Sequence, residues 1–221
     1  MPKKAVPQIT GQEYTAFDQA YAYCNTVLFS GKLRPCLITL QRQARSYGYF
    51  AVGRFQDRTV EVHTTDELAL NPDTFAGRSD TDMLSTLVHE MVHCWQQHFG
   101  TPPLRGYHDR AWAVHMVAIG LMPADTGAPG GKQTGQHMGH DILPGKPFDR
   151  AAAVLLATDF RLHWQSLADK PQHNKLRSKT KYQCPVCEQN AWAKPTAQLF
   201  CGLCKCSMGA MRSAWLVKRV T

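Results

Sequence analysis

Apolar residues recur every three or four positions in four stretches of the chain, which is the spacing of a helix that buries one face. Turn-forming residues stand where these stretches stop; the first, for example, stops near Gly31. The pattern predicts helices at about residues 14–30, 80–99, 109–121 and 149–167.

Between the first and second helices the pattern changes to β-branched and aromatic residues separated by turn formers. Strands are predicted at residues 36–41, 47–55 and 60–64, and a glycine-rich loop at 123–136. Helices that accompany a short antiparallel sheet indicate an α+β domain.

The second helix has the clearest ends. Ser79 and Asp82 have the spacing of a capping box, and Gly100, followed by two prolines, ends the helix. Its apolar face consists of Leu84, Leu87, Val88, Met91, Val92 and Trp95. Polar residues in so apolar a helix are costly to bury unless something compensates them.

The polar residues in this helix form the pattern His-Glu-Met-Val-His. His89 and His93 lie one turn apart on the same face, so both imidazoles can reach one Zn²⁺ at about 2.0–2.1 Å. Glu90 projects beside them, where a carboxylate can accept a proton from the attacking water. The pattern therefore predicts the zinc site of a hydrolase.

A catalytic zinc site uses three protein ligands and keeps one position open. His108 is the preferred third ligand. A short loop joins the second and third predicted helices, so the start of the third helix is expected to lie close to the second. His115 lies two turns further on and is the alternative. His98 points away from the ligand face. His63 is expected to be a partly buried histidine whose polar groups are satisfied by neighbours, and Cys94 is expected to serve packing.

The charge of the chain is unevenly distributed. Residues 170–221 contain 10 Lys and Arg and one acidic residue, a net charge of +9, whereas residues 1–169 have a net charge of −1. A basic module beside a near-neutral domain indicates a polyanionic partner. The predicted organisation is a metalloprotease domain at 1–169, a basic linker at 170–182 and a zinc ribbon at 183–221.

Four cysteines of the basic module have the spacing of a zinc ribbon. Cys184 and Cys187 form one C-x-x-C pair, and Cys201 and Cys204 form another after thirteen residues. Two such pairs close a tetrahedral site with no open position, so this second zinc is expected to be structural. Cys206 is left over and either replaces Cys204 or remains free.

Cations and aromatic residues are interleaved in the same module. Cations neutralise phosphates, and aromatic faces stack on unpaired bases at about 1–3 kcal/mol each. We therefore predict DNA, with single-stranded character, as a partner, although at least one aromatic residue is expected to be structural. The residues expected to contact nucleic acid are Lys181, Tyr182, Trp192, Lys194, Lys205, Arg212 and Trp215.

The order of these features resembles the SprT/Spartan family of metalloproteases, over about residues 12–206. The N-terminal helix and the strands precede the histidine motif, and a His-x-x-His-Asp segment at 137–141 and the cysteines follow it. The motif residues that carry the resemblance are His89, Glu90, His93, His108 and Trp112.

This resemblance implies a zincin-like endopeptidase domain, in which His89, His93 and His108 hold a catalytic zinc and Glu90 is catalytic. It also implies that the substrates are proteins bound or crosslinked to DNA and that activity is tied to DNA binding. The alternatives are a protease for one specific regulatory protein and a non-catalytic DNA-binding zinc protein. Tyr107, His137 and His140 are candidates to stabilise the oxyanion.

No apolar run approaches the roughly 20 residues of a membrane span, so no membrane partner is expected. Met1-Pro2-Lys3-Lys4 is not followed by an apolar stretch, so a cytoplasmic protein is expected, associated with the nucleoid in a bacterium. Cysteines in that compartment stay reduced and tend to serve metals or chemistry.

Overall fold

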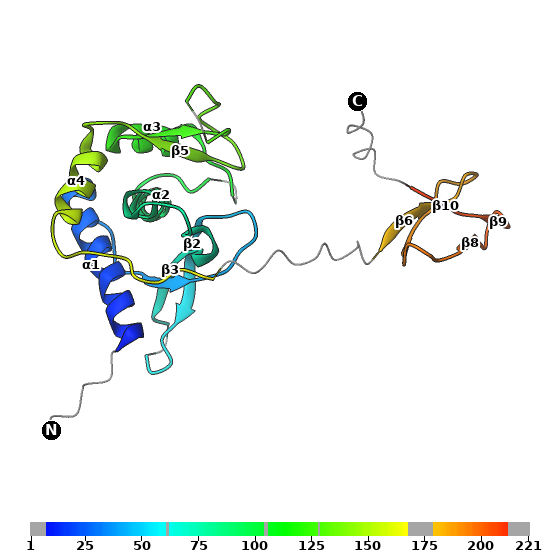
Figure 1. Cartoon of the computed structure of the whole chain (residues 1–221), viewed down its shortest axis with the longest axis horizontal. Helices are drawn as coiled ribbons and strands as arrows, with labels where there is room; N and C mark the ends of the chain where they lie inside the picture. Colours follow the sequence, from blue (N-terminus) through cyan, green and yellow to red (C-terminus); the bar gives the residue numbers. More distant parts are fainter. Residues whose placement is uncertain (1–7, 61, 104–105, 128, 168–178, 212–221) are drawn as a thin grey trace. The chain divides into compact units, whose positions relative to one another are not determined.

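The computed structural model describes residues 8–60, 62–103, 106–127, 129–167 and 179–211. The chain divides into two compact units, Met1–Leu167 and Ala168–Thr221 (Figure 1). Each unit is described by itself below.

The helices described in the first unit are α1 (Ile9–Phe29), α2 (Asp80–Phe99), α3 (Arg110–Ile119) and α4 (Pro147–Leu156). The bounds of α2 agree with the prediction. Within the described ranges, none of the helices has the length and apolar character needed to cross a membrane.

Helix α4 ends well before the predicted residue 167 because side chains just beyond it close its C-terminus. The Thr158 hydroxyl donates to the carbonyl of Leu155 at 2.6 Å and accepts a hydrogen bond from the Phe160 N–H at 3.2 Å. Phe160 is thereby turned into the core, where it is buried. The chain then runs without helix to Ser166, whose N–H donates to the carbonyl of Pro72.

Strands β1 (Leu37–Leu40), β2 (Gly48–Gln56) and β3 (Thr64–Leu70) form one sheet in the order β1-β3-β2. β2 is antiparallel to β3, but β1 is parallel to it. The predicted antiparallel sheet is therefore wrong in this respect: the sheet is mixed. The fold class is α+β, as predicted.

The central strand β3 lies at 64–70, where the sequence pattern predicted a strand at 60–64. Two acidic residues inside β3 interrupt the apolar pattern that predicts a strand, and both accept hydrogen bonds from neighbouring strands. Glu67 accepts hydrogen bonds from the hydroxyls of Thr39 at 2.6 Å and Tyr49 at 3.0 Å. Asp66 accepts one from the Gly53 N–H at 2.8 Å.

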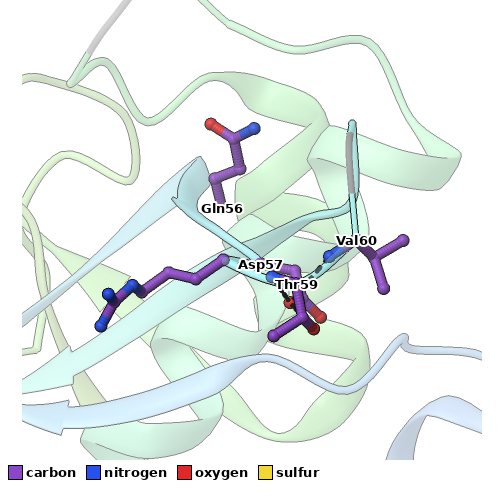
Figure 2. A pocket seen from close by; sticks show the side chains of 5 residues that line it. Gln56, Asp57, Thr59 and Val60 are labelled. Carbon is purple, nitrogen blue, oxygen red and sulfur yellow. Dashed lines mark hydrogen bonds between the residues drawn. The ribbon is translucent and has the colours of Figure 1, made fainter.

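Residues 57–60 begin the connection between β2 and β3 and line a surface pocket (Figure 2). The Asp57 carboxylate accepts hydrogen bonds from the hydroxyl and the N–H of Thr59, both at 2.7 Å, and from the Val60 N–H at 3.2 Å. These bonds, the Thr59 hydroxyl first, lower the pKa of Asp57 to about 2. Such local bonds favour a turn over a strand.

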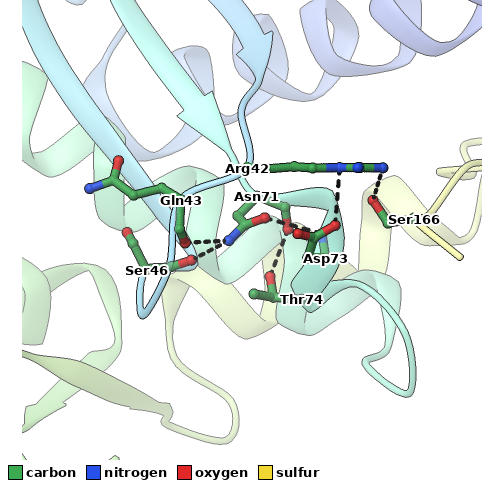
Figure 3. A network of polar contacts seen from close by, with 7 residues as sticks. All are labelled: Arg42, Gln43, Ser46, Asn71, Asp73, Thr74 and Ser166. Atoms are coloured by element: carbon green, nitrogen blue, oxygen red, sulfur yellow. Dashed lines mark hydrogen bonds and ion pairs between the residues drawn. The ribbon is translucent and has the colours of Figure 1, made fainter. Parts of the chain in front are cut away.

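A polar network fixes the β1–β2 loop against the short 3₁₀ helix η1 (Pro72–Thr74), as Figure 3 shows. The buried Asn71 amide donates to the carbonyls of Gln43 at 2.7 Å and Ser46 at 2.8 Å. Arg42 pairs with Asp73 at 3.2 Å. The network thereby fixes the position at which β2 starts.

Helix α2 is the centre of the first unit (Figure 1). It contacts α1, α3 and α4 as well as β2 and β3. Its most buried apolar residues, each at most 1% exposed, are Leu84, Leu87, Val88, Met91, Val92 and Cys94. The predicted capping box is present, since Ser79 Oγ accepts from the Asp82 N–H and the Asp82 carboxylate accepts from the Ser79 N–H.

Strands β4 (Leu121–Ala124) and β5 (Gly139–Ile142) pair as an antiparallel hairpin after α3. The glycine-rich loop predicted at 123–136 is only the connection of this hairpin, because Leu121–Ala124 is already strand. Helix α3 can turn directly into β4 because Gly120, at φ 102°, takes the left-handed conformation that favours glycine.

The second unit contains β6 (Thr180–Gln183), β7 (Asn190–Ala193) and β10 (Gly209–Ala210), in the order β10-β6-β7. Strands β8 (Phe200–Cys201) and β9 (Cys206–Ser207) form a separate hairpin. The linker predicted at 170–182 lies mostly outside the described residues, and its last residues belong to β6.

We predict that Ser79→Ala lowers the free energy of unfolding of the first unit by about 0.5–2 kcal/mol, because it removes the cap of the central helix. Urea denaturation followed by far-ultraviolet circular dichroism measures this. Thr101→Ala, at an exposed position beyond α2, is the control and should change stability by less than about 0.5 kcal/mol. Equal losses in the two variants would contradict the role of the cap.

Candidate metal centres

Helix α2 and the segment just before α3 bring three imidazoles together. The ligand nitrogens of His89, His93 and His108 all lie within 4.8 Å of one another. His89 Nε2 is 3.3 Å from His108 Nε2. Two nitrogens bound to one tetrahedral zinc at about 2.0–2.1 Å are separated by about 3.3 Å. The structure therefore groups the three predicted ligands at a spacing that fits one zinc ion.

His108 is held by the connection of the β4–β5 hairpin. Its N–H and carbonyl pair with the carbonyl and N–H of Gly135 at 2.8 and 3.0 Å. Its ring Nδ1 lies 3.1 Å from the same Gly135 carbonyl. Because a carbonyl oxygen only accepts, Nδ1 carries the proton and Nε2 keeps the lone pair that a metal requires.

Trp112 packs against all three rings. It stacks on His93 with a centroid distance of 5.4 Å and an interplanar angle of 19°. It meets His89 and His108 edge-on, at 4.9 and 4.4 Å. The indole is fully buried, so it restricts the orientations available to each imidazole.

The three imidazoles are held in their neutral form. Burial lowers the pKa of His93 to about 3, and it also lowers the pKa values of His89 and His108. Neutral imidazole is the form that binds a metal.

Glu90 is buried, and β2 passes directly over it. A Cβ atom added at Gly48 would lie 3.2 Å from Glu90 Cγ and Oε1, and 2.6 Å from the Ala69 carbonyl oxygen. Glycine is therefore required for β2 to approach the carboxyl group this closely. Burial raises the pKa of Glu90 to about 8, and a cation held by the imidazoles would oppose this rise.

Three other histidines, at positions 63, 98 and 115, are not part of this group. His115, the alternative third ligand, stacks on Trp95 at 3.8 Å and on Phe29 at 5.7 Å. His98 Nε2 lies 2.5 Å from Asp66, off the ligand face as predicted. His63 was expected to be partly buried, but its side chain is 67% exposed.

Cys94, which was expected to serve packing, is fully buried. It lies beside Asp66 and His98, so its surroundings are more polar than a packing role alone suggests.

Of the three candidates to stabilise the oxyanion, His140 is excluded by its contacts. Its Nδ1 is 3.1 Å from His89 Nδ1 and its Nε2 is 2.8 Å from Ser85 Oγ, so both nitrogens are engaged. Tyr107 and His137 are exposed. Sequence reasoning missed Ser85, Gly48 and Gly135, whose importance comes only from contacts across the fold.

The second unit brings the predicted cysteines together. The sulfurs of Cys184, Cys187, Cys201 and Cys204 lie within 4.8 Å of one another, with Cys187 and Cys201 3.7 Å apart. Thiolates at about 2.3 Å from one tetrahedral zinc are about 3.8 Å apart. The sulfur of Cys206 is 3.6 Å from that of Cys184, so a fifth thiol adjoins the group.

The residues predicted to contact nucleic acid have different environments. Trp192 is 62% exposed and pairs across the sheet with Lys181. Tyr182 is buried and its hydroxyl donates to the Lys194 carbonyl at 2.9 Å. A buried ring cannot stack on a base, so the prediction that Tyr182 contacts nucleic acid is wrong. Lys205 lies in the turn between β8 and β9. Arg212 and Trp215 lie outside the described residues.

Comparison with known proteins identifies the family. Residues 17–131, just over half of the chain, match the SprT-like family, so the chain belongs to it. It is also 45% identical over 64 residues to an uncharacterized protein in the mucB 3′ region of Salmonella typhimurium. That match covers 29% of this chain and 85% of the Salmonella protein. No solved structure matches the chain.

We predict that Cys201→Ser removes one zinc per chain, because Cys201 is buried within the four-cysteine group. Cys206→Ser is the matched variant and should keep the wild-type zinc content. Elemental analysis of the purified, desalted proteins measures both. Loss of zinc in Cys206→Ser with full retention in Cys201→Ser would contradict this assignment of ligands.

Proposed function

We propose that this protein is a zinc-dependent endopeptidase that cleaves proteins bound or crosslinked to DNA. The observation that carries the proposal is the grouping of His89, His93 and His108 beside the buried Glu90. Membership of the SprT-like family supports a metalloprotease-like function. We also propose that the first unit is zincin-like, with two of the ligands on α2 and the third just before α3.

The three imidazoles are the residues that would hold the catalytic zinc. Their nitrogens fit its coordination distances, and the Gly135 carbonyl fixes the tautomer of His108. A bound zinc supplies a Lewis acid that polarises the scissile carbonyl and lowers the pKa of water. The cysteine group of the second unit would hold a second, structural zinc.

Glu90 would act as the general base and then as the general acid. It follows His89 on α2, and its carboxyl group is buried beneath Gly48 at the start of β2. It would accept a proton from the attacking water and pass it to the leaving amine. Burial, which raises the pKa of Glu90, favours a group that can both take and return a proton near neutral pH.

The exposed Tyr107 and His137 remain our candidates for stabilising the oxyanion. Tyr107 is adjacent to the ligand His108, and His137 lies two residues beyond Gly135, which pairs with His108. Either group can donate a hydrogen bond to developing negative charge.

The second unit would bring the enzyme to DNA. The net charge of +9 in residues 170–221 favours phosphate, and Trp192 beside Lys181 offers an aromatic face next to a cation. Because both units belong to one chain, DNA binding would raise the local concentration of the peptidase near DNA-bound proteins.

We expect Glu90→Gln to abolish cleavage of a DNA-bound protein while zinc content stays at the wild-type level, because Glu90 is not one of the grouped ligands. The assay incubates the purified chain with a DNA-binding protein, with and without DNA, and detects fragments by electrophoresis. Chelation of zinc should stop cleavage by the wild type, and added zinc should restore it.

Cleavage by Glu90→Gln at the wild-type rate would exclude this role for Glu90. Cleavage of one regulatory protein regardless of DNA would instead favour a dedicated protease. Zinc binding without any cleavage by the wild type would favour a non-catalytic DNA-binding protein.

Trp192→Ala should weaken binding to single-stranded DNA by about 1–3 kcal/mol, and Lys181→Ala should lower the salt dependence of binding by about 0.7 units of log–log slope. Fluorescence anisotropy at several salt concentrations measures both. Trp164→Ala is the matched control, because this tryptophan is 50% exposed but belongs to the first unit. Binding that does not change with salt would indicate a protein partner for the second unit.

A further inference from the structure

A chain of hydrogen bonds runs behind His89, on the side of the ring away from His108. His89 Nδ1 lies 3.1 Å from His140 Nδ1, and His140 Nε2 lies 2.8 Å from Ser85 Oγ. The Ser85 hydroxyl lies 2.8 Å from the backbone carbonyl of Asp82, one turn earlier in α2. The chain links β5 to two positions of the helix that carries the metal-binding motif.

The donor and acceptor of each hydrogen bond can be assigned by starting from the Asp82 carbonyl at the end of the chain. The Asp82 carbonyl only accepts, so the single hydroxyl proton of Ser85 points to it. Ser85 Oγ must then accept from His140, which places the His140 proton on Nε2 and leaves Nδ1 as an acceptor. His89 therefore donates from Nδ1, and the lone pair of its Nε2 faces His108 Nε2.

We propose that His140 is a positioning residue that fixes the tautomer and ring orientation of His89 for metal binding. The inference deepens the proposed function and rests on its zinc site. It also gives the β4–β5 hairpin a role in orienting two of the three imidazoles. Within one hairpin, the Gly135 carbonyl orients His108 and the His140 ring orients His89.

The hairpin is tied to the unit independently of these two rings. The Leu143 N–H donates to the Gly120 carbonyl at 2.9 Å. Across the connection, the backbone N–H of Asp125 donates to the carbonyl of Lys132, also at 2.9 Å. The position of His140 is therefore set by backbone pairing, and the His89 ring meets a partner that is already in place. Outer partners of this kind typically contribute 10- to 100-fold, as an order of magnitude, to metal affinity.

Two substitutions separate positioning from space filling. His140→Phe keeps an aromatic ring but removes the acceptor, and should weaken zinc binding at the imidazole site by about 10- to 100-fold. His140→Asn places an amide oxygen near the position of Nδ1 and should restore affinity to within a few-fold of wild type. His163→Phe, at an exposed position after α4, is the control and should bind zinc as the wild type does.

The measurement is a zinc titration of the full-length chain against a competing chelator, followed by ¹⁵N nuclear magnetic resonance of the histidine rings. These signals report the imidazole site separately from the cysteine site. In the metal-free wild type, the same spectra should show His89 protonated at Nδ1 and His140 protonated at Nε2. This readout requires no variant and is independent of proteolysis.

His89 protonated at Nε2 in the wild type would overturn the inference. So would His140→Phe binding zinc as tightly as the wild type, or His140→Asn binding more weakly than His140→Phe, which is the order expected of a residue that only fills space. A wild-type imidazole site that binds no zinc would instead refute the proposed function itself.

Discussion

The first unit depends on the burial of an imidazole and a carboxyl group, His89 and Glu90, within the apolar helix α2. His89 and Glu90 are at most 7% exposed, and they share α2 with leucines and valines that are almost fully buried. Buried polar groups are destabilising unless they are hydrogen bonded or bind a metal. The surrounding elements meet this requirement by supplying outer hydrogen bonds from one side and leaving the facing nitrogens of His89 and His108 3.3 Å apart.

This constraint explains why the elements around α2 have their particular shapes. β2 begins with a glycine because a side chain there would collide with the Ala69 carbonyl and with Glu90. The Asn71 network holds the loop that leads into this glycine. Trp112 packs against the rings, and the hairpin after α3 contacts α2 through His140 and the segment before α3 through Gly135.

The sequence was most informative where local chemistry determines structure. The ends of α2 follow from its capping residues, and the grouping of His89, His93 and His108 was predicted from their spacing across a short connection. The C-x-x-C pairs likewise predicted the cysteine group. Each of these signals lies within one short segment of the chain, where spacing is informative.

The errors arose where distant contacts override the local pattern. β3 contains two acidic residues, and only Thr39, Tyr49 and Gly53 on neighbouring strands make their burial possible. Part of the glycine-rich segment proved to be strand because β5 pairs with it. His140 was predicted as a candidate to stabilise the oxyanion. Its two hydrogen bonds instead join β5 to α2, and sequence spacing cannot predict such contacts.

The most direct test of this account is anomalous diffraction at the zinc absorption edge from crystals of the full-length protein. The account predicts a peak within about 2.0–2.1 Å of one ring nitrogen from each of His89, His93 and His108, with one coordination position not taken by protein. A peak whose fourth ligand is a side chain, or the absence of a peak between these three rings in zinc-loaded crystals, would contradict it.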